Sequence, residues 1–272
     1  MQQLTDNVFV ETGIRGCNPG FVITADGVVL IDTPFEVSSA KEWEAKFAEW
    51  GGLRYIINTE PHLDHTLNNA IFSGTVIAHQ ATRTAILAIN LAEMGELIQP
   101  VYREPVLIPE GHHLKPPTMT FSERLTLFLG NHTFELINLP GHTAGQTAVY
   151  IPQERVVFTG DNVFCRRRTF FQEALPDRWL ESLKVLEELD VRFIVPGHGE
   201  VTDKTYLKEQ ASIVRGWVEA VRRAKAAGLD LDEALAKGIF HDPYPVDPSF
   251  NPAMIDILSR FNLARLYEVV TP

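Results

Sequence analysis

Seven side chains able to bind metal ions follow directly on predicted strands of this 272-residue chain. Strand ends held by a rigid sheet are where α/β proteins position reactive groups. Three of these side chains also stand beside glycine, which lets the backbone turn tightly and approach a site closely. The seven are Glu60, His62, Asp64 and His65 after a first strand, His142 after a second, Asp161 after a third and His198 after a fourth.

This mixture of imidazole and carboxylate suits zinc, iron or manganese. Two such ions a few ångströms apart hold a bridging hydroxide and polarise a carbonyl or phosphoryl oxygen. A pair of ions needs several protein ligands, including one carboxylate that bridges them. Seven candidates are enough, so the pattern indicates metal-dependent chemistry.

The elements that must position these residues begin with short strands. Asp26-Gly27 predicts a hairpin turn between two of them. Ala40, Trp43 and Phe47 recur at helical spacing and predict an amphipathic helix over 36–50. The other predicted elements of this half are strands at 8–10, 21–24, 28–31, 53–58 and 75–78 and a helix at about 79–93.

The second half repeats this style and ends in a helical tail. Residues 96–120 are rich in proline and carry no clear period, so we expect an ordered loop of the length typical of a lid or a mobile segment. Two strand-rich halves, each followed by helices, predict two β-sheets packed face to face with helices outside. The further elements are strands at 125–129, 132–139, 146–151, 156–159 and 193–195 and helices at 177–189, 203–227, 230–238 and 253–269. We expect 1–202 to form one metal-binding domain and 203–272 a helical extension packed on it, or a dimer face.

The order of the motifs resembles the metallo-β-lactamase superfamily across roughly residues 6–200. That family carries His-x-His-x-Asp-His, then Gly-His, then a bridging Asp and a last Gly-His. Asp32 also stands where the family has an aspartate at a strand end before the metal loop. The corresponding motifs here are Glu60-x-His62-x-Asp64-His65, Gly141-His142, Gly160-Asp161 and Gly197-His198-Gly199.

The resemblance implies an α/β (α+β) fold, an αββα four-layer sandwich with a two-metal site at one edge. Carried over by position, Asp161 bridges the two ions. Asp64 also orients the hydroxide, so Asp64 and Asp161 are the catalytic residues we expect. The first site would be Glu60, His62 and His142, and the second Asp64, His65 and His198.

Glu60 departs from the family, which usually has histidine at this position. A carboxylate there adds negative charge and tilts the first site from zinc toward manganese or iron, or weakens it. It also makes a bound water less acidic. We expect two divalent ions, zinc first, with manganese or iron as alternatives. The other interpretation is that Glu60 points away from the site as a surface residue.

Several other residues have a weaker claim to function. We interpret His79 as the start of a helix or a residue behind the ligands, and His112 and His113 as loop residues rather than parts of a lid. His132 and His241 are expected on the surface. Three arginines at 166–168 suggest either binding of an anionic substrate or, as we prefer, a solvated turn.

Composition excludes some partners and compartments. The formal charge is −11, and no lysine-rich run exists, so a nucleic-acid partner is not expected. No stretch is long and apolar enough to span a membrane, and the N-terminus resembles no secretory signal. With only two cysteines, Cys17 and Cys165, the chain has no disulfide-framework pattern, and a cytoplasmic location is the default.

The leading functional hypothesis is a binuclear metallohydrolase whose metal-bound hydroxide attacks a small ester, lactone, thioester or related substrate. The resemblance ranks antibiotic hydrolysis lower, because two-zinc β-lactamases usually lack the bridging aspartate. One alternative is a mononuclear non-haem iron oxygenase that oxidises persulfides, with Glu60, His62 and His142 as its two-histidine, one-carboxylate set. Another is a metal-binding protein without catalysis. A small-molecule substrate is the expected partner, and a homodimer is compatible with the tail.

Overall fold

The computed structural model describes residues 1–271, and its first half forms a seven-stranded mixed sheet whose strands are arranged in chain order. The strands up to β4 pair antiparallel, and those from β4 to β7 pair parallel. The hairpin predicted at Asp26-Gly27 is present, and Gly27 has the positive φ of 119° that such a turn requires. The strands are β1 (Gln2–Gln3), β2 (Val8–Val10), β3 (Gly20–Thr24), β4 (Gly27–Ile31), β5 (Leu53–Ile57), β6 (Thr75–His79) and β7 (Met119–Phe121).

A second sheet of five strands has the order β13-β11-β10-β9-β8, in which only β11 and β13 pair parallel. A short parallel pair, β12 with β14, brings Phe164 beside His198. These strands are β8 (Arg124–Leu129), β9 (His132–Asn138), β10 (Thr147–Ile151), β11 (Val156–Phe158), β12 (Phe164–Cys165), β13 (Phe193–Val195) and β14 (His198–Gly199).

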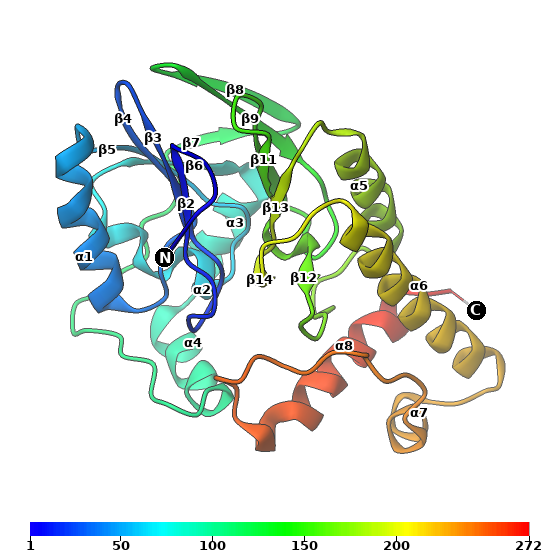
Figure 1. Ribbon diagram of the computed structural model, residues 1–272. Coiled ribbons are helices and arrows are strands. Elements are labelled where there is room, and N and C mark those ends of the chain that lie inside the picture. Colours follow the sequence, from blue (N-terminus) through cyan, green and yellow to red (C-terminus); the bar gives the residue numbers. More distant parts are fainter. Residues whose placement is uncertain (272) are drawn as a thin grey trace.

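The two sheets pack face to face over a core of buried aliphatic and aromatic side chains such as Val29, Val149 and Phe158. Helix α1 (Val37–Phe47), followed by the turn η1 (Ala48–Trp50), covers the outer face of the first sheet. Helices α5 (Pro176–Glu188) and α6 (Thr205–Ala226) cover the outer face of the second (Figure 1). Each of the three contacts, sheet on sheet and helices on either outer face, is stabilised by the burial of apolar surface. Such burial contributes about 25 cal/mol per Å². The predicted αββα sandwich is confirmed.

The connections between β5, β6 and β7 of the first sheet differ from the prediction in two places. The helix expected over 79–93 is two helices, because Asn90 caps a new one by accepting a hydrogen bond from the amide of Ala92. The expected loop over 96–120 is shorter at both ends, since helical structure continues to Val101 and the strand β7 begins at Met119. The elements here are α2 (Leu63–Thr66), η2 (Leu67–Ile71), α3 (Gln80–Ala88), α4 (Leu91–Ile98) and η3 (Gln99–Val101).

The helices predicted for the tail are present as α6, α7 (Leu231–Lys237), η5 (Pro252–Met254) and α8 (Ile255–Val269). The side chains of Trp217 and Val221 on α6 are buried in the core beside α5. The segment before α8 pairs with the segment after α4 through a bridge between Tyr102 and Phe250. Figure 1 shows α4 and α8 at the end of the sandwich where β12 and β14 lie. Residue 272, the last of the predicted extension, lies outside the described residues.

Over residues 1–271, every helix is too short or too polar to cross a membrane.

Candidate metal centre

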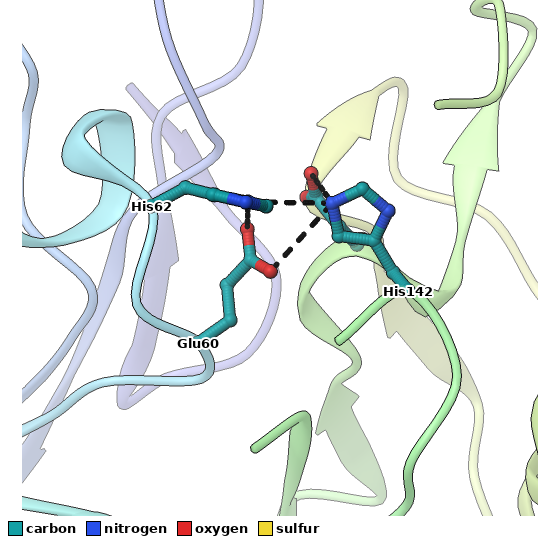
Figure 2. A group of neighbouring side chains, drawn as sticks. Glu60, His62 and His142 are labelled. Atoms are coloured by element: carbon teal, nitrogen blue, oxygen red, sulfur yellow. Dashed lines mark hydrogen bonds and ion pairs between the residues drawn. The ribbon is translucent and has the colours of Figure 1, made fainter. Parts of the chain in front are cut away.

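The predicted ligands meet at one edge of the sandwich because the strands that precede them end there. Glu60 and His62 follow β5, His142 follows β9, and Asp161 follows β11 in the turn η4 (Gly160–Asn162). His198 lies in β14. Figure 2 shows the side chains of Glu60 and His62, from the segment after β5, and of His142, from a second segment, pointing toward one another.

A first group contains Glu60, His62, His142 and Asp161, each offering a donor atom within 4.8 Å of the others. Glu60 Oε1 lies 2.9 Å from His62 Nδ1, and His62 Nδ1 lies 3.3 Å from His142 Nε2. The Glu60 side chain is fully buried. The interpretation of Glu60 as a surface residue is therefore wrong, since its carboxylate faces the imidazoles.

A second group contains Asp64, His65 and His198. Asp64 Oδ2 lies 3.4 Å from His198 Nε2 and 3.8 Å from His65 Nε2. Asp161 lies between the groups, with Oδ1 3.2 Å from His65 Nε2 and Oδ2 3.3 Å from His198 Nε2 and 3.7 Å from His142 Nε2. The structure thus divides the seven residues as the motif carry-over does, with Asp161 placed between the two sets.

The donor atoms of this cluster fit divalent metal ions. In the part of the chain that the structure describes, Glu60 Oε2, His65 Nε2 and Asp161 Oδ1 are buried without a hydrogen-bond partner. Leaving such atoms unsatisfied costs about 1–3 kcal/mol each, and more when the group is charged. Cations coordinated by these atoms would remove that cost, and imidazole with carboxylate is the donor set of zinc, manganese and iron sites.

Groups behind the cluster hold the imidazoles in place. Asp32 Oδ2 lies 2.8 Å from His65 Nδ1, and Asp32 in turn accepts hydrogen bonds from the amide and hydroxyl of Thr59 at 2.8 and 2.6 Å. The carbonyl oxygen of Phe170 lies 2.9 Å from His142 Nδ1. Such partners orient a ligand and set which ring nitrogen carries the proton.

Glu173 is the polar neighbour that the sequence did not reveal. Its Oε1 lies 3.3 Å from His62 Nε2, the nitrogen that faces away from Glu60. Glu173 lies in an irregular segment before α5, more than 100 residues from His62, and has no motif around it. Only the path of the chain after β12 brings it here.

Opposite charges perturb the pKa values of the cluster. Burial alone would lower the pKa of His62, but the carboxylates of Glu60 and Glu173 outweigh burial and raise it well above its ordinary value. For His198, Asp161 and Asp64 likewise outweigh burial and raise the pKa to about 10. Without metal, these imidazoles therefore hold protons among carboxylates, and ion binding must displace those protons.

Close packing leaves no room for side chains at the glycine beside His198. A Cβ atom on Gly197 would collide with Asp161 Oδ1 and with the backbone of Gly160. Glycine at 197 thus lets Asp161 approach the second group. This close packing explains why glycine precedes His198 in the Gly-His motif.

A third cluster, Cys17, Asp32 and His65, also brings metal-binding atoms together. Asp32 is already engaged with Thr59 and His65, so this cluster supports the second group from behind. Burial raises the pKa of the Cys17 thiol to about 12, which keeps it protonated and a poor ligand. Cys165 is also buried, and burial raises its pKa as well.

The remaining histidines behave as predicted except one. His79 caps the N-terminus of α3, where its side chain accepts a hydrogen bond from the amide of Ala81. His112 contacts the carbonyl of Leu67 in the loop, and His241 is exposed. The prediction that His132 lies on the surface is wrong, because its ring is buried with Nε2 2.7 Å from Glu154 Oε1.

The three arginines are engaged in contacts outside the cluster. Arg166 pairs with Glu200 at 3.2 Å, and Arg167 lies 3.6 Å from Asp247. Arg168 donates to the hydroxyl of Ser259 in α8. Arg167 and Arg168 thus connect the segment after β12 to the tail.

A pocket of about 580 Å³ opens directly on the cluster. His62, Asp64, Asp161 and His198 form its polar end. Its volume lies within the range of small-molecule binding sites. A bound molecule would therefore contact both groups of metal-binding residues.

Comparisons with known proteins bear on the family and the fold of this chain. A family model described as the metallo-beta-lactamase superfamily matches residues 12–198. The alpha subunit of a 2,4-dinitroanisole O-demethylase from Nocardioides sp. (strain JS1661) is 27% identical over 238 residues, 84% of this chain and 64% of that protein. A hydroxyacylglutathione hydrolase from Bartonella quintana (strain Toulouse) is 32% identical over 112 residues, 40% of this chain and 44% of the relative. The chain thus spans less than two thirds of the length of these curated relatives.

Among solved structures, a metallo-beta-lactamase family protein from Thermus thermophilus superposes with a TM-score of 0.68 at 18% identity. The superposition covers 97% of this chain and 92% of that one, so it includes the helical tail. At this identity the likeness shows the fold alone.

Proposed function

This chain belongs to the metallo-beta-lactamase superfamily, and on that premise we propose that it hydrolyses a small ester, lactone or thioester at a two-metal centre. The observation that carries the proposal is the cluster itself. Two complete donor groups share Asp161, contain buried atoms that lack partners within the described chain, and open on one pocket.

In this proposal Glu60, His62 and His142 would hold one divalent ion, and Asp64, His65 and His198 would hold the other. Asp161, which lies between the two groups, would serve both. Bound there, the ions would supply Lewis-acid chemistry, lowering the pKa of water and polarising the oxygen of the scissile bond.

The protein's own residues position the reaction. Asp32 and Glu173 contact the outer nitrogens of His65 and His62, which keeps their inner nitrogens directed at the centre. Asp64 is partly exposed at the pocket wall, with 19% of its side-chain surface accessible. Its carboxylate is therefore placed to orient an attacking water and to accept its proton.

An iron-dependent persulfide oxygenase is the second candidate function, and the grouping of Glu60 with His62 and His142 favours it. A two-histidine, one-carboxylate set suits non-haem iron. Against it stands the second group, which is equally complete. Oxygen uptake with glutathione persulfide by anaerobically iron-loaded protein tests this candidate, and uptake at background level would remove it.

The test of the hydrolase is metal content followed by turnover. Protein purified without chelator should contain close to two divalent ions per chain and should hydrolyse members of a panel of esters, lactones and thioesters. The panel should include a hydroxyacylglutathione, and the aryl methyl ether 2,4-dinitroanisole should be tested beside it, since the names of the two relatives suggest both compounds. Fewer than one ion per chain after reconstitution would instead support a protein that has lost catalysis.

A further inference from the structure

The pocket beside the metal centre has a mainly apolar wall built by two segments far apart in sequence. Met94 and Ile98 of α4 line one side. Phe250, before α8, and Leu258, within it, line another. The bridge between Tyr102 and Phe250 holds these two segments together. The part of a substrate away from the reacting bond would thus contact hydrocarbon.

The charged groups on this wall, apart from the metal cluster, are all acids. They are Glu93 of α4 and Glu173, and both are exposed. Among residues 1–271, no lysine or arginine lines the pocket. A carboxylate or phosphate on the substrate would meet like charge here without a basic partner, which is unfavourable.

A basic group behind this wall, Arg15, is already neutralised. The guanidinium of Arg15 lies 5.7 Å from the ring centre of Phe35 and 5.4 Å from that of Tyr102, and both rings line the pocket. Its N–H groups, however, donate to Glu36 and to the carbonyls of Glu104 and Pro105. It is therefore committed to holding the loop rather than to binding an anion.

Glu60 also weakens the attraction of the centre itself for anions. Two divalent ions would bring four positive charges, and Glu60, Asp64 and Asp161 carry three negative ones. A neutral histidine in place of Glu60 would leave one more positive charge. With Glu173 beside His62, the charge of the loaded centre is close to balanced.

We infer that the substrate is an uncharged ester whose non-reacting part is apolar, an inference that rests on the proposed hydrolase function. Water adds as hydroxyl to the acyl carbon while the ester C–O bond breaks, and the remaining proton goes to the departing alcohol oxygen. The new carboxylic acid ionises and then faces Glu93 and Glu173. Repulsion between these charges favours release of the product.

Two esters of equal length test the charge preference. One is 4-nitrophenyl pentanoate, and the other is mono-4-nitrophenyl glutarate, which carries a carboxylate in place of the terminal methyl. With metal-loaded protein at physiological salt, we expect kcat/KM at least tenfold higher for the pentanoate. Equal or higher kcat/KM for the glutarate would overturn the inference and leave the hydrolase proposal standing.

Variants on α4 assign the preference to the pocket wall. Glu93→Gln should lower the ratio of kcat/KM for the pentanoate to kcat/KM for the glutarate at least threefold. Leu97→Lys, at an exposed position that also lines the pocket, should raise kcat/KM for the glutarate. Glu96→Gln is the matched control, because Glu96 lies on the same helix but lines a different hollow, and it should leave the ratio unchanged. An equal effect of Glu93→Gln and Glu96→Gln would contradict the role of the wall.

A binding measurement distinguishes failure of this inference from failure of the hydrolase proposal. If neither ester is hydrolysed faster than by metal-stripped protein, the hydrolase proposal fails for esters. Calorimetry with the two corresponding 4-nitroanilides then decides the pocket's preference. We expect the uncharged anilide to bind at least tenfold more tightly, and equal affinities would overturn the inference.

Discussion

Replacement of Asp32 by asparagine tests whether the support behind His65 sets metal affinity. Asp32 is buried and accepts three contacts, two from Thr59 and one at 2.8 Å with His65 Nδ1. Asparagine has nearly the same shape, and it tolerates the left-handed backbone that Asp32 adopts at φ 52°. The fold should therefore survive while the charge beside His65 is lost.

The size of the effect follows from the contact that is removed. A hydrogen bond to a charged group contributes about 1.5–3 kcal/mol. Since about 1.4 kcal/mol corresponds to a factor of ten in an equilibrium constant, the loss predicts metal affinity weakened by about 10- to 100-fold. Removal of other outer partners of metal-binding histidines has effects of about this size. The weakening of metal affinity should affect mainly one of the two ions, because His65 belongs to the second group.

Competition with a chromophoric chelator measures this affinity without depending on turnover. Asp6→Asn is the matched control, since Asp6 is exposed in the loop before β2, and it should bind metal like the unmodified protein. Circular dichroism of the metal-free variants checks that folding is retained. A well-folded Asp32→Asn protein with both affinities within twofold of the original would refute the assignment of Asp32 to this role.

Three further outcomes are expected. Asp161→Ala removes the carboxylate shared by both groups, so metal content should fall by at least one ion per chain and turnover should be lost. The control His241→Ala should change neither quantity. Near-full activity in Asp161→Ala would contradict the assignment of the site. Glu60→His should shift preference toward zinc over manganese, measured by metal analysis after equal exposure to both, and unchanged content would mean that Glu60 is not a ligand. The carboxylates that raise the pKa of His198 to about 10 keep it protonated at neutral pH without metal, so binding must release protons. Metal affinity should therefore rise with pH from 6 to 9, and calorimetry in buffers of different ionisation enthalpy should show proton release; a pH-independent affinity would contradict this.

The same raised pKa has a consequence for the metal-free protein. A group whose pKa is higher in the folded state stabilises the fold below its unfolded pKa, and this contribution is lost as the pH rises through the folded pKa. For His198 the window extends from about 6.5, its ordinary value, to about 10. The metal-free fold therefore loses this part of its stability toward alkaline pH.

Local pattern was sufficient for most of the secondary structure. Alternating or continuous apolar runs and the Asp26-Gly27 turn predicted the strands, because the conformation of each depends on neighbouring residues. Pattern failed where one residue interrupts a continuous apolar helix, as Asn90 does between α3 and α4. It failed again at His132, whose burial depends on Glu154 across the sheet.

The sequence by itself determined the chemical identity and the order of the candidate donor groups. It also indicated that they meet, because every predicted ligand follows a strand and these strands end at the same edge. Sequence left open the direction of Glu60, and only the tertiary structure turned its carboxylate inward between the imidazoles of His62 and His65.

The tertiary structure alone also decided the character of the pocket. Its walls come from α4, the segment containing Glu173, and the region around α8, which are distant in sequence. Their charges lie around one pocket because packing of the tail against the sandwich brings these segments together. A local pattern carries no information about contacts between distant segments, so the candidate ligands were readable from the sequence and the lining of the pocket was not.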